Sequence, residues 1–157
     1  MIIIVGVIAL LFVGLYFANQ YKTKTAIEKS GNPYGKDNLH QATVDQLDDP
    51  LYQNQITPTD LAASLEEKEG VTVYFYDPLC KWCLETTPVL VPVAEDNDVD
   101  VKKLNLREFP AEKQKYNIEG TPTLVHYVDG EEVGRLSGSA EDKVFERFFE
   151  NYVLNEE

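Results

Sequence analysis

The chain of 157 residues is poor in cysteine, histidine and tryptophan, with two, two and one of each. Two cysteines exclude the dense disulfide framework on which many small secreted domains depend. Positive charge is also scarce, because 14 Lys and Arg stand against 27 Asp and Glu. Residues 31–157 hold 26 of these acidic residues and 11 of the basic ones, a net charge of −15. A surface of this sign repels nucleic acid, so we expect no nucleic-acid partner.

Charge is entirely absent from the first 21 residues, and Ile2–Ala18 is apolar or glycine throughout. As a helix this stretch would span about 25 Å, close to the hydrocarbon thickness of a bilayer. The basic region and small-residue cleavage site of a signal peptide are missing. We therefore predict an uncleaved transmembrane anchor over residues 1–21. The lysines that follow it at positions 22, 24 and 29 would, by the positive-inside rule, place the rest of the chain in the cytoplasm.

The remainder divides into two parts by pattern. Residues 22–55 are polar, contain several glycines and prolines, and show no sustained periodicity, so we predict a polar tether. Residues 56–157 alternate helical and strand patterns, which predicts an α/β domain. The expected helices are 57–69, 80–94 (bent or interrupted at its two prolines), 109–116 and one from 140 onward; the expected strands are 71–76, 99–106, 123–128 and 132–137.

The two cysteines occur together in Asp77–Pro88, "DPLCKWCLETTP", after a buried strand and at the start of a helix. Unpaired N–H groups and the helix dipole stabilise a thiolate at such a position, so Cys80 should have a lowered pKa. Lys81 adds a neighbouring positive charge. Cys83 lies one turn further along the same face and is able to close a disulfide with Cys80. The pair is therefore predicted to act as a nucleophile and a resolving thiol.

Other interpretations of these residues stay open at this point. Half a zinc site would need His40 and His126, whose spacing fits no common zinc motif. Two inert buried thiols are a further possibility. The ring of Trp82 either forms an exposed apolar surface for a substrate peptide or folds back onto the domain.

These residues, together with others at consistent spacing, resemble the thioredoxin family from about Thr57 to Leu154. The matching segments are "VTVYFY" before the cysteines, Pro88, "VKKLNL" and "YNIEGTPTLVHYVDGEEV". With its anchor, the whole chain resembles membrane-tethered thioredoxin-like proteins of Gram-positive bacteria. The resemblance implies a thioredoxin-like α/β fold, with a mixed four-stranded central sheet flanked by helices and preceded by one transmembrane helix.

The resemblance also implies roles for individual residues. Cys80 would be the attacking thiol and Cys83 the resolving one. A cis bond between Thr121 and Pro122 would lie beside them and, with Trp82, would bind an extended substrate peptide. Lys103 matches the family's lysine near the site and, like Lys81, is expected to tune thiol pKa values. Three departures are the Lys-Trp pair between the cysteines, Leu79 in place of an aromatic residue, and Tyr74 in place of a buried acid.

We therefore expect a membrane-tethered thiol-disulfide oxidoreductase that acts on protein thiols as a monomer and needs no organic cofactor or metal. Following the resemblance, we expect its domain outside the cytoplasmic membrane, against the distribution of lysines. Two alternatives remain: an accessory factor for export or maturation of a disulfide-containing peptide or bacteriocin, and a non-catalytic peptide-binding module of the same fold.

Overall fold

The computed structural model describes residues 2–154, and its mixed four-stranded sheet confirms the predicted fold class. The strands are β1 (Val71–Tyr76), β2 (Val101–Asn105), β3 (Thr123–Val128) and β4 (Glu131–Ser137). They lie in the order β2-β1-β3-β4, with β1 parallel to β2 and the other pairs antiparallel. Every residue of β1 is buried, because this central strand is covered on both faces.

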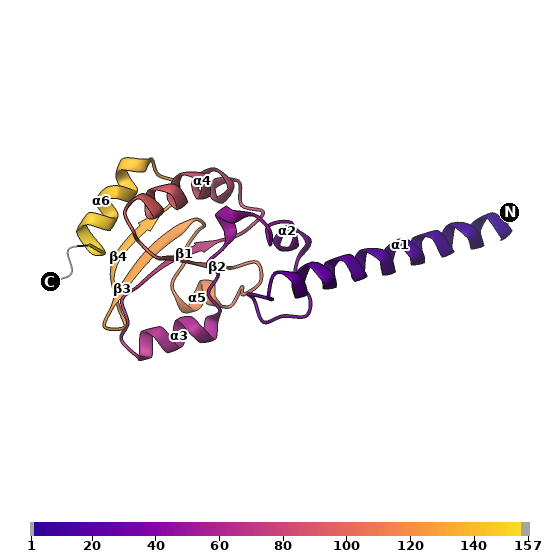
Figure 1. Cartoon of the computed structure of the whole chain (residues 1–157), viewed down its shortest axis with the longest axis horizontal. Helices are drawn as coiled ribbons and strands as arrows, with labels where there is room; N and C mark the ends of the chain where they lie inside the picture. Colours follow the sequence, from indigo (N-terminus) through magenta and orange to yellow (C-terminus); the bar gives the residue numbers. More distant parts are fainter. Residues whose placement is uncertain (1, 155–157) are drawn as a thin grey trace.

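Helices cover both faces of the sheet (Figure 1). In chain order, the helices of the described chain are α1 (Ile2–Lys29), which extends away from the sheet, α2 (Gln41–Val44), the 3₁₀ helix η1 (Pro50–Tyr52), α3 (Pro58–Glu66), α4 (Lys81–Asp96), α5 (Glu112–Lys115) and α6 (Asp142–Tyr152). One core lies under α4 and α6 and contains Leu90 and Phe145, whereas a second lies under α3 and contains Leu61. The sheet is thus the middle of three layers, as the pattern of residues 56 onward predicted.

Local signals in the sequence explain where several elements begin. Thr57 caps α3, since its hydroxyl accepts from the Asp60 N–H at 3.2 Å. Asp129 and Gly130 connect β3 to β4 with positive φ values of 52° and 82°, which the Asp-Gly pair favours in a hairpin turn. The predicted hairpin is confirmed, and residues 155–157 of the predicted domain lie outside the described residues.

Of the predicted bend or interruption after Cys80, the interruption is wrong, because α4 is continuous through Pro88 and Pro92. Both prolines are exposed and four residues apart, so they lie on the outer face of the helix. Each ring removes one N–H donor, and the carbonyls left without that donor face the solvent on this side. The helix therefore keeps its buried face intact below the prolines.

The helix α1 is longer than the predicted anchor, as it continues to Lys29. Its segment Ile4–Lys29 is long and apolar enough to cross a membrane. From Ile4 to Phe17 its large apolar side chains are exposed, for example Leu10 and Phe12, which are 73% and 69% exposed. An exposed apolar surface of this size is typical of a segment that contacts a membrane or a partner.

The segment predicted as a polar tether is ordered in the structure. Ile27, Tyr34 and Leu47 bury one another in a small apolar cluster, and Tyr52 joins the core under α4. Backbone bonds from the residues just before α3 extend the sheet beside β2; the Ile56 N–H, for instance, donates to a β2 carbonyl at 2.9 Å. These apolar residues are too irregularly spaced to give a periodic signal, which is why the pattern suggested a tether.

Candidate active site

The loop between β1 and α4 carries both cysteines. Cys80 is the N-cap of α4, with extended backbone (φ −74°, ψ 117°), and Cys83 lies one turn inside the helix. The Cys80 N–H donates to the Asp77 carbonyl at 3.0 Å. The Asp77 carboxylate accepts from the Leu79 N–H at 2.8 Å and pairs with Arg107 at 2.8 Å. These bonds hold the Cys80 side chain at the amino end of α4, and both sulfurs are free thiols.

The Cys80 thiol is only partly buried, and its sulfur lies 3.3 Å from the Thr121 carbonyl oxygen, to which it donates. Burial is the largest influence on its ionisation and opposes it. Hydrogen bonds from the Thr121 side chain, the Cys83 thiol, and the backbone N–H groups of Cys83 and Trp82 stabilise the thiolate and together outweigh burial. The pKa of Cys80 is therefore lower than that of an ordinary thiol, as a nucleophile requires.

The Cys83 thiol is fully buried beneath Cys80. Its pKa is raised to about 12, mainly by burial and also by the adjacent Cys80 sulfur, while hydrogen bonds from the Asp77 backbone and Thr121 act in the opposite direction. The two thiols therefore differ strongly in acidity although only two residues separate them. Cys83 is poorly suited to attack a substrate in solution, but it lies where it can reach a disulfide formed on Cys80.

A pair of hydroxyl groups lies beneath Cys83, where the resemblance suggested a missing carboxylate. The Thr87 hydroxyl donates to the Cys83 carbonyl at 2.8 Å, and the Tyr74 hydroxyl lies 3.2 Å from the Thr87 oxygen. Because Thr87 has already used its only proton, Tyr74 is the donor between them. Burial raises the pKa of Tyr74, so its phenol stays neutral and offers Cys83 no basic group.

Lys103 is buried on β2, in register with Tyr74 on β1. Its ammonium donates to the Gln53 carbonyl at 2.9 Å. Burial lowers its pKa, while Glu95 and Asp100 act in the opposite direction. A main-chain carbonyl from the segment before α3 thus takes the place of a carboxylate partner, and the tuning role of Lys103 stays a prediction.

The surface around Cys80 is apolar and open. Leu79 and Trp82 are each 55% exposed, and Leu84 on the next turn is also exposed. Trp82 therefore does not fold back onto the domain. Lys81 extends over the Trp82 ring, 5.2 Å from its centroid, and reaches Glu85 at 3.7 Å. Since Lys81 already has this acidic neighbour in solvent, its effect on the Cys80 pKa also stays a prediction.

The Thr121–Pro122 peptide bond is cis, which confirms the prediction. Its predicted proximity to the cysteines is also confirmed, because the Thr121 carbonyl is the acceptor of the Cys80 thiol. The Gly138 N–H donates to the Pro122 carbonyl at 2.8 Å and so connects this loop to the end of β4. The structure thus brings Cys80, Cys83 and Thr121 together.

Two residues of the site were missed from the sequence. Thr87 lies four residues after Cys83, and this i, i+4 spacing on a helix was a signal that would have identified it. Tyr52 belongs to the same apolar cluster as Cys83, and its ring centroid is 5.6 Å from that of Tyr76. Nothing local in the sequence placed Tyr52 there, because it reaches the site from the segment predicted as a tether.

The histidines weighed as zinc ligands serve other contacts. His40 accepts from the Ala42 N–H at 3.2 Å and caps α2, whereas His126 on β3 lies 2.8 Å from the Thr72 hydroxyl. Within residues 2–154 there is no group of three His, Cys, Asp or Glu side chains arranged to hold a metal ion.

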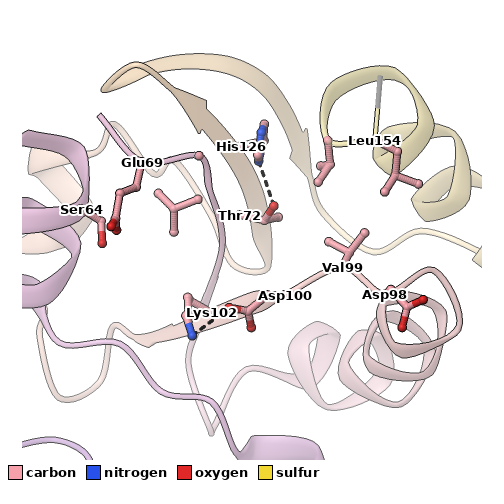
Figure 2. Close-up of a pocket in the computed structure, with 12 residues that line it drawn as sticks. Ser64, Glu69, Thr72, Asp98, Val99, Asp100, Lys102, His126 and Leu154 are labelled. Carbon is pink, nitrogen blue, oxygen red and sulfur yellow. Dashed lines mark hydrogen bonds and ion pairs between the residues drawn. The ribbon is translucent and has the colours of Figure 1, made fainter. Parts of the chain in front are cut away.

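A cavity of ≈ 580 Å³ lies at the opposite end of the sheet from the cysteines (Figure 2). It opens beside the amino end of β1, whereas the cysteine loop follows the carboxyl end of this strand. His126 and Thr72 form part of its wall, and on another part of the wall Lys102 pairs with Asp100, two residues before it, at 2.9 Å. The polar side chains that line the cavity thus contact one another, and the length of β1 separates them from the thiols.

Comparison with known proteins identifies relatives of the same kind. Residues 53–151 match the family described as Thioredoxin. A thioredoxin of Porphyra purpurea is 26% identical over 113 residues, which cover 71% of this chain and 98% of that protein. A thioredoxin of Staphylococcus epidermidis is 34% identical over 87 residues, or 54% of this chain and 82% of the relative. Among solved structures, a mutant thioredoxin from Halobacterium salinarum has a TM-score of 0.54 and 31% identity, covering 62% of this chain and 86% of that one.

Proposed function

Since the chain belongs to the thioredoxin family, we propose that it is a membrane-anchored oxidoreductase that exchanges disulfides with protein thiols through Cys80 and Cys83. The observation that carries this proposal is that the pKa values of two neighbouring thiols are shifted in opposite directions. The pKa of the accessible thiol is lowered, and the pKa of the buried thiol is raised to about 12. An inert pair in a common environment would have no reason to differ in this way.

The geometry supports a two-step exchange. The Cys80 thiolate attacks one sulfur of a substrate disulfide, which forms a mixed disulfide and releases the other substrate sulfur as a thiolate that takes up a proton. The Cys83 thiol then loses its proton and attacks the Cys80 sulfur, which frees the second substrate thiol and leaves a Cys80–Cys83 disulfide. The substrate gains two electrons that the dithiol loses, and the reverse sequence oxidises a substrate. Neither step uses an organic cofactor or a metal.

The second step has an unusual feature in this chain. The Tyr74 phenol and the Thr87 hydroxyl beneath Cys83 are neutral, so neither accepts the proton of Cys83 readily. The substrate sulfur that Cys83 displaces from Cys80 leaves as a thiolate, and this leaving group is the base that the step itself supplies for that proton. Resolution should therefore depend on the chemistry at Cys80, and mixed disulfides should persist longer than they would beside a buried carboxylate.

Substrate peptides would bind across the open surface beside Cys80. Trp82 provides an exposed apolar ring, and Thr121 and Pro122 provide backbone within reach of the thiol. An extended segment that pairs with this backbone would present its disulfide to Cys80. The protein would act as a monomer, since the site is completed by residues of one chain.

We assign the anchor to the apolar part of α1 and place the domain outside the cytoplasmic membrane. The exposed apolar side chains of α1 support membrane insertion. The lysines that follow would favour the opposite orientation, so the side is tested directly. Protease added to intact protoplasts should digest the domain, and protection equal to that of a cytoplasmic marker would reverse the assignment.

Reduction of insulin by dithiothreitol tests the redox function. The full chain in detergent should accelerate precipitation of the insulin B chain, and the Cys80→Ser/Cys83→Ser double variant is the matched control. Equal rates of precipitation with the two proteins would refute the redox function and favour a non-catalytic binding module. The equilibrium potential of the pair against glutathione would then assign the direction of exchange, with about 30 mV corresponding to 1.4 kcal/mol.

A further inference from the structure

The connection between membrane helix and redox domain is rigid. The helix α1 continues beyond its apolar stretch to Lys29, where the Asn32 N–H donates to the Ile27 carbonyl at 3.0 Å. Ile27, on the last helical turn, is 3% exposed and packs against Tyr34 and Leu47. Burial of Ile27 in this apolar cluster opposes free rotation of the domain about the end of the helix.

The segment after α1 contacts the domain at the carboxyl ends of β1 and β2. The Tyr34 hydroxyl lies 3.2 Å from that of Tyr76, the last residue of β1. The Asn105 amide, at the end of β2, donates to the Thr43 hydroxyl at 3.1 Å. Both strands therefore present their carboxyl ends to this segment. Because β1 and β2 are parallel, their carboxyl ends lie together, and these contacts hold that end of the sheet beside the base of α1.

A buried carboxylate strengthens the same attachment. Glu108, three residues beyond β2, is 6% exposed. It accepts from the His40 N–H at 2.9 Å and pairs with Lys36 at 3.4 Å. A buried carboxylate that has two partners from one segment holds that segment firmly, because separating them would leave the charge unpaired.

The loop that carries the cysteines begins at the same end of the sheet, at the carboxyl end of β1. Asp77 directly follows Tyr76 and pairs with Arg107, next to Glu108. Cys80 follows three residues later at the start of α4. In Figure 1, α1 extends away from the domain on the side of α2, where the carboxyl ends of β1 and β2 lie. The side of the domain that carries the thiols is thus the side that faces along α1.

The length of α1 defines the space between this side and the bilayer. From Ala18, the end of the apolar stretch, to Lys29 the helix rises about 16 Å, and the head-group layer occupies about 5–7 Å of this. About 10 Å remains, enough for an extended peptide. The net charge of −15 on residues 31–157 opposes adsorption to anionic head groups, so the exposed Leu79 and Trp82 fit a polypeptide better than lipid.

From these observations we infer that the thiol face of the domain is directed toward the membrane and serves cysteines close to the bilayer surface, in proteins embedded in the same membrane. The inference rests on the proposed anchor and redox function. It adds a substrate class, namely juxtamembrane cysteines, to a chemistry that would otherwise accept any accessible disulfide. A rigid connection restricts the site to partners at this height and excludes long excursions into the solvent.

The single tryptophan provides a direct test of the orientation. The full chain is reconstituted into neutral phosphatidylcholine vesicles that contain a lipid with a dansyl head group, and energy transfer from Trp82 is measured. The matched control is the Trp82→Phe/Leu154→Trp variant, which moves the donor to the exposed position of Leu154, beside the cavity of Figure 2. On the inferred orientation, this position lies farther from the bilayer by about 20 Å, the length of the six residues of β1. Transfer should be severalfold higher from Trp82, and equal or reversed transfer would overturn the inference.

A second measurement tests the substrate class. A disulfide peptide is attached to a transmembrane helix either directly or through a long Gly-Ser spacer, and the full chain reduces each in the same vesicles. The direct substrate should react severalfold faster. A Gly-Ser insertion between Ser30 and Gly31, which frees the domain, should remove most of this difference.

These outcomes separate the inference from the proposed function. Equal rates on both peptides, with insulin reduction intact, would overturn the inference and leave the redox function in place. Loss of insulin reduction would instead refute the function. Failure to insert in vesicles would refute the anchor and the inference together. A blue shift of Trp82 emission on adding vesicles that contain no peptide would show that the face binds lipid, against the inference.

Discussion

The surface at Cys80 and the interior at Cys83 are two regions separated by a single helical turn, and they have opposite chemistry. At the surface, helix N–H groups and the Thr121 side chain stabilise negative charge, so the pKa of Cys80 is lowered. In the interior, the Thr87 hydroxyl bonds to the Cys83 carbonyl and not to its thiol, and burial raises the pKa of Cys83. The difference shows that the position of a thiol relative to a helix start, rather than its separation in sequence, determines its reactivity.

Removing each thiol in turn tests this comparison most strongly. The Cys80→Ser variant should lose insulin reduction down to the uncatalysed rate, because the remaining thiol is buried and protonated. The Cys83→Ser variant should still attack but should not resolve, so substrates accumulate as mixed disulfides on Cys80. Non-reducing gels after trapping would show these adducts. More adducts on Cys80→Ser than on Cys83→Ser would reverse the two roles.

The second largest effect is expected in the rates at which the two thiols are alkylated at different pH values. A thiol with a pKa of about 12 is ionised to a fraction of only about 10⁻⁵ at pH 7, whereas one with a pKa below 9 exceeds about 10⁻². Iodoacetamide should therefore modify Cys80 at least about a thousandfold faster than Cys83 at neutral pH. Peptide mass spectrometry would measure both rates between pH 5 and 9. Similar rates at the two positions would remove the basis of the comparison.

The interior thiol should also affect stability at high pH. In the unfolded chain Cys83 ionises near pH 9, but in the folded protein it stays protonated until about pH 12. Between these values the unfolded state binds fewer protons, so stability decreases as pH rises, by about 1.4 kcal/mol at pH 10. Urea unfolding of the reduced protein at pH 8 and pH 10 would measure the loss. In the Cys83→Ser variant this component of the loss should vanish.

Removing the Tyr74 hydroxyl should have a smaller effect. The phenol is neutral and only donates to Thr87, so the Tyr74→Phe variant should resolve mixed disulfides at nearly the wild-type rate. Loss of the hydrogen bond should cost about 1 kcal/mol of stability. Stopped-flow resolution of a trapped adduct, compared with wild type, tests this. A large slowing would show that the hydroxyl pair carries the Cys83 proton.

The smallest effect is expected from Lys81→Gln. Its ammonium is exposed and already paired with Glu85, so water screens its field at Cys80. The pKa of Cys80, read from the alkylation rate against pH, should rise only slightly. A rise comparable to one full unit would show that Lys81, and not the helix start, lowers this pKa.

Much of the fold and the chemistry was predictable from the sequence, because the signals are local. Apolar periodicity placed β1 and the terminal helix, Thr57 and the Asp-Gly pair marked a helix start and a turn, and the uncharged stretch predicted α1. The spacing of Cys80 and Cys83 behind a buried strand was enough to predict a surface thiol and a deeper thiol. Resemblance to a known family supplied the cis bond at Pro122.

Long-range packing decided the rest. No periodicity in the segment before α3 indicated that Ile27 would bury itself near Tyr34, or that Tyr52 would share a cluster with Cys83. Contacts of this kind join residues far apart in sequence through isolated apolar side chains, which leave no repeating pattern. The direction of the thiol face relative to α1 has the same origin, because it depends on which edge of the sheet that segment binds. The sequence alone determined the reactive pair, and only the tertiary structure determined its surroundings and the direction it faces.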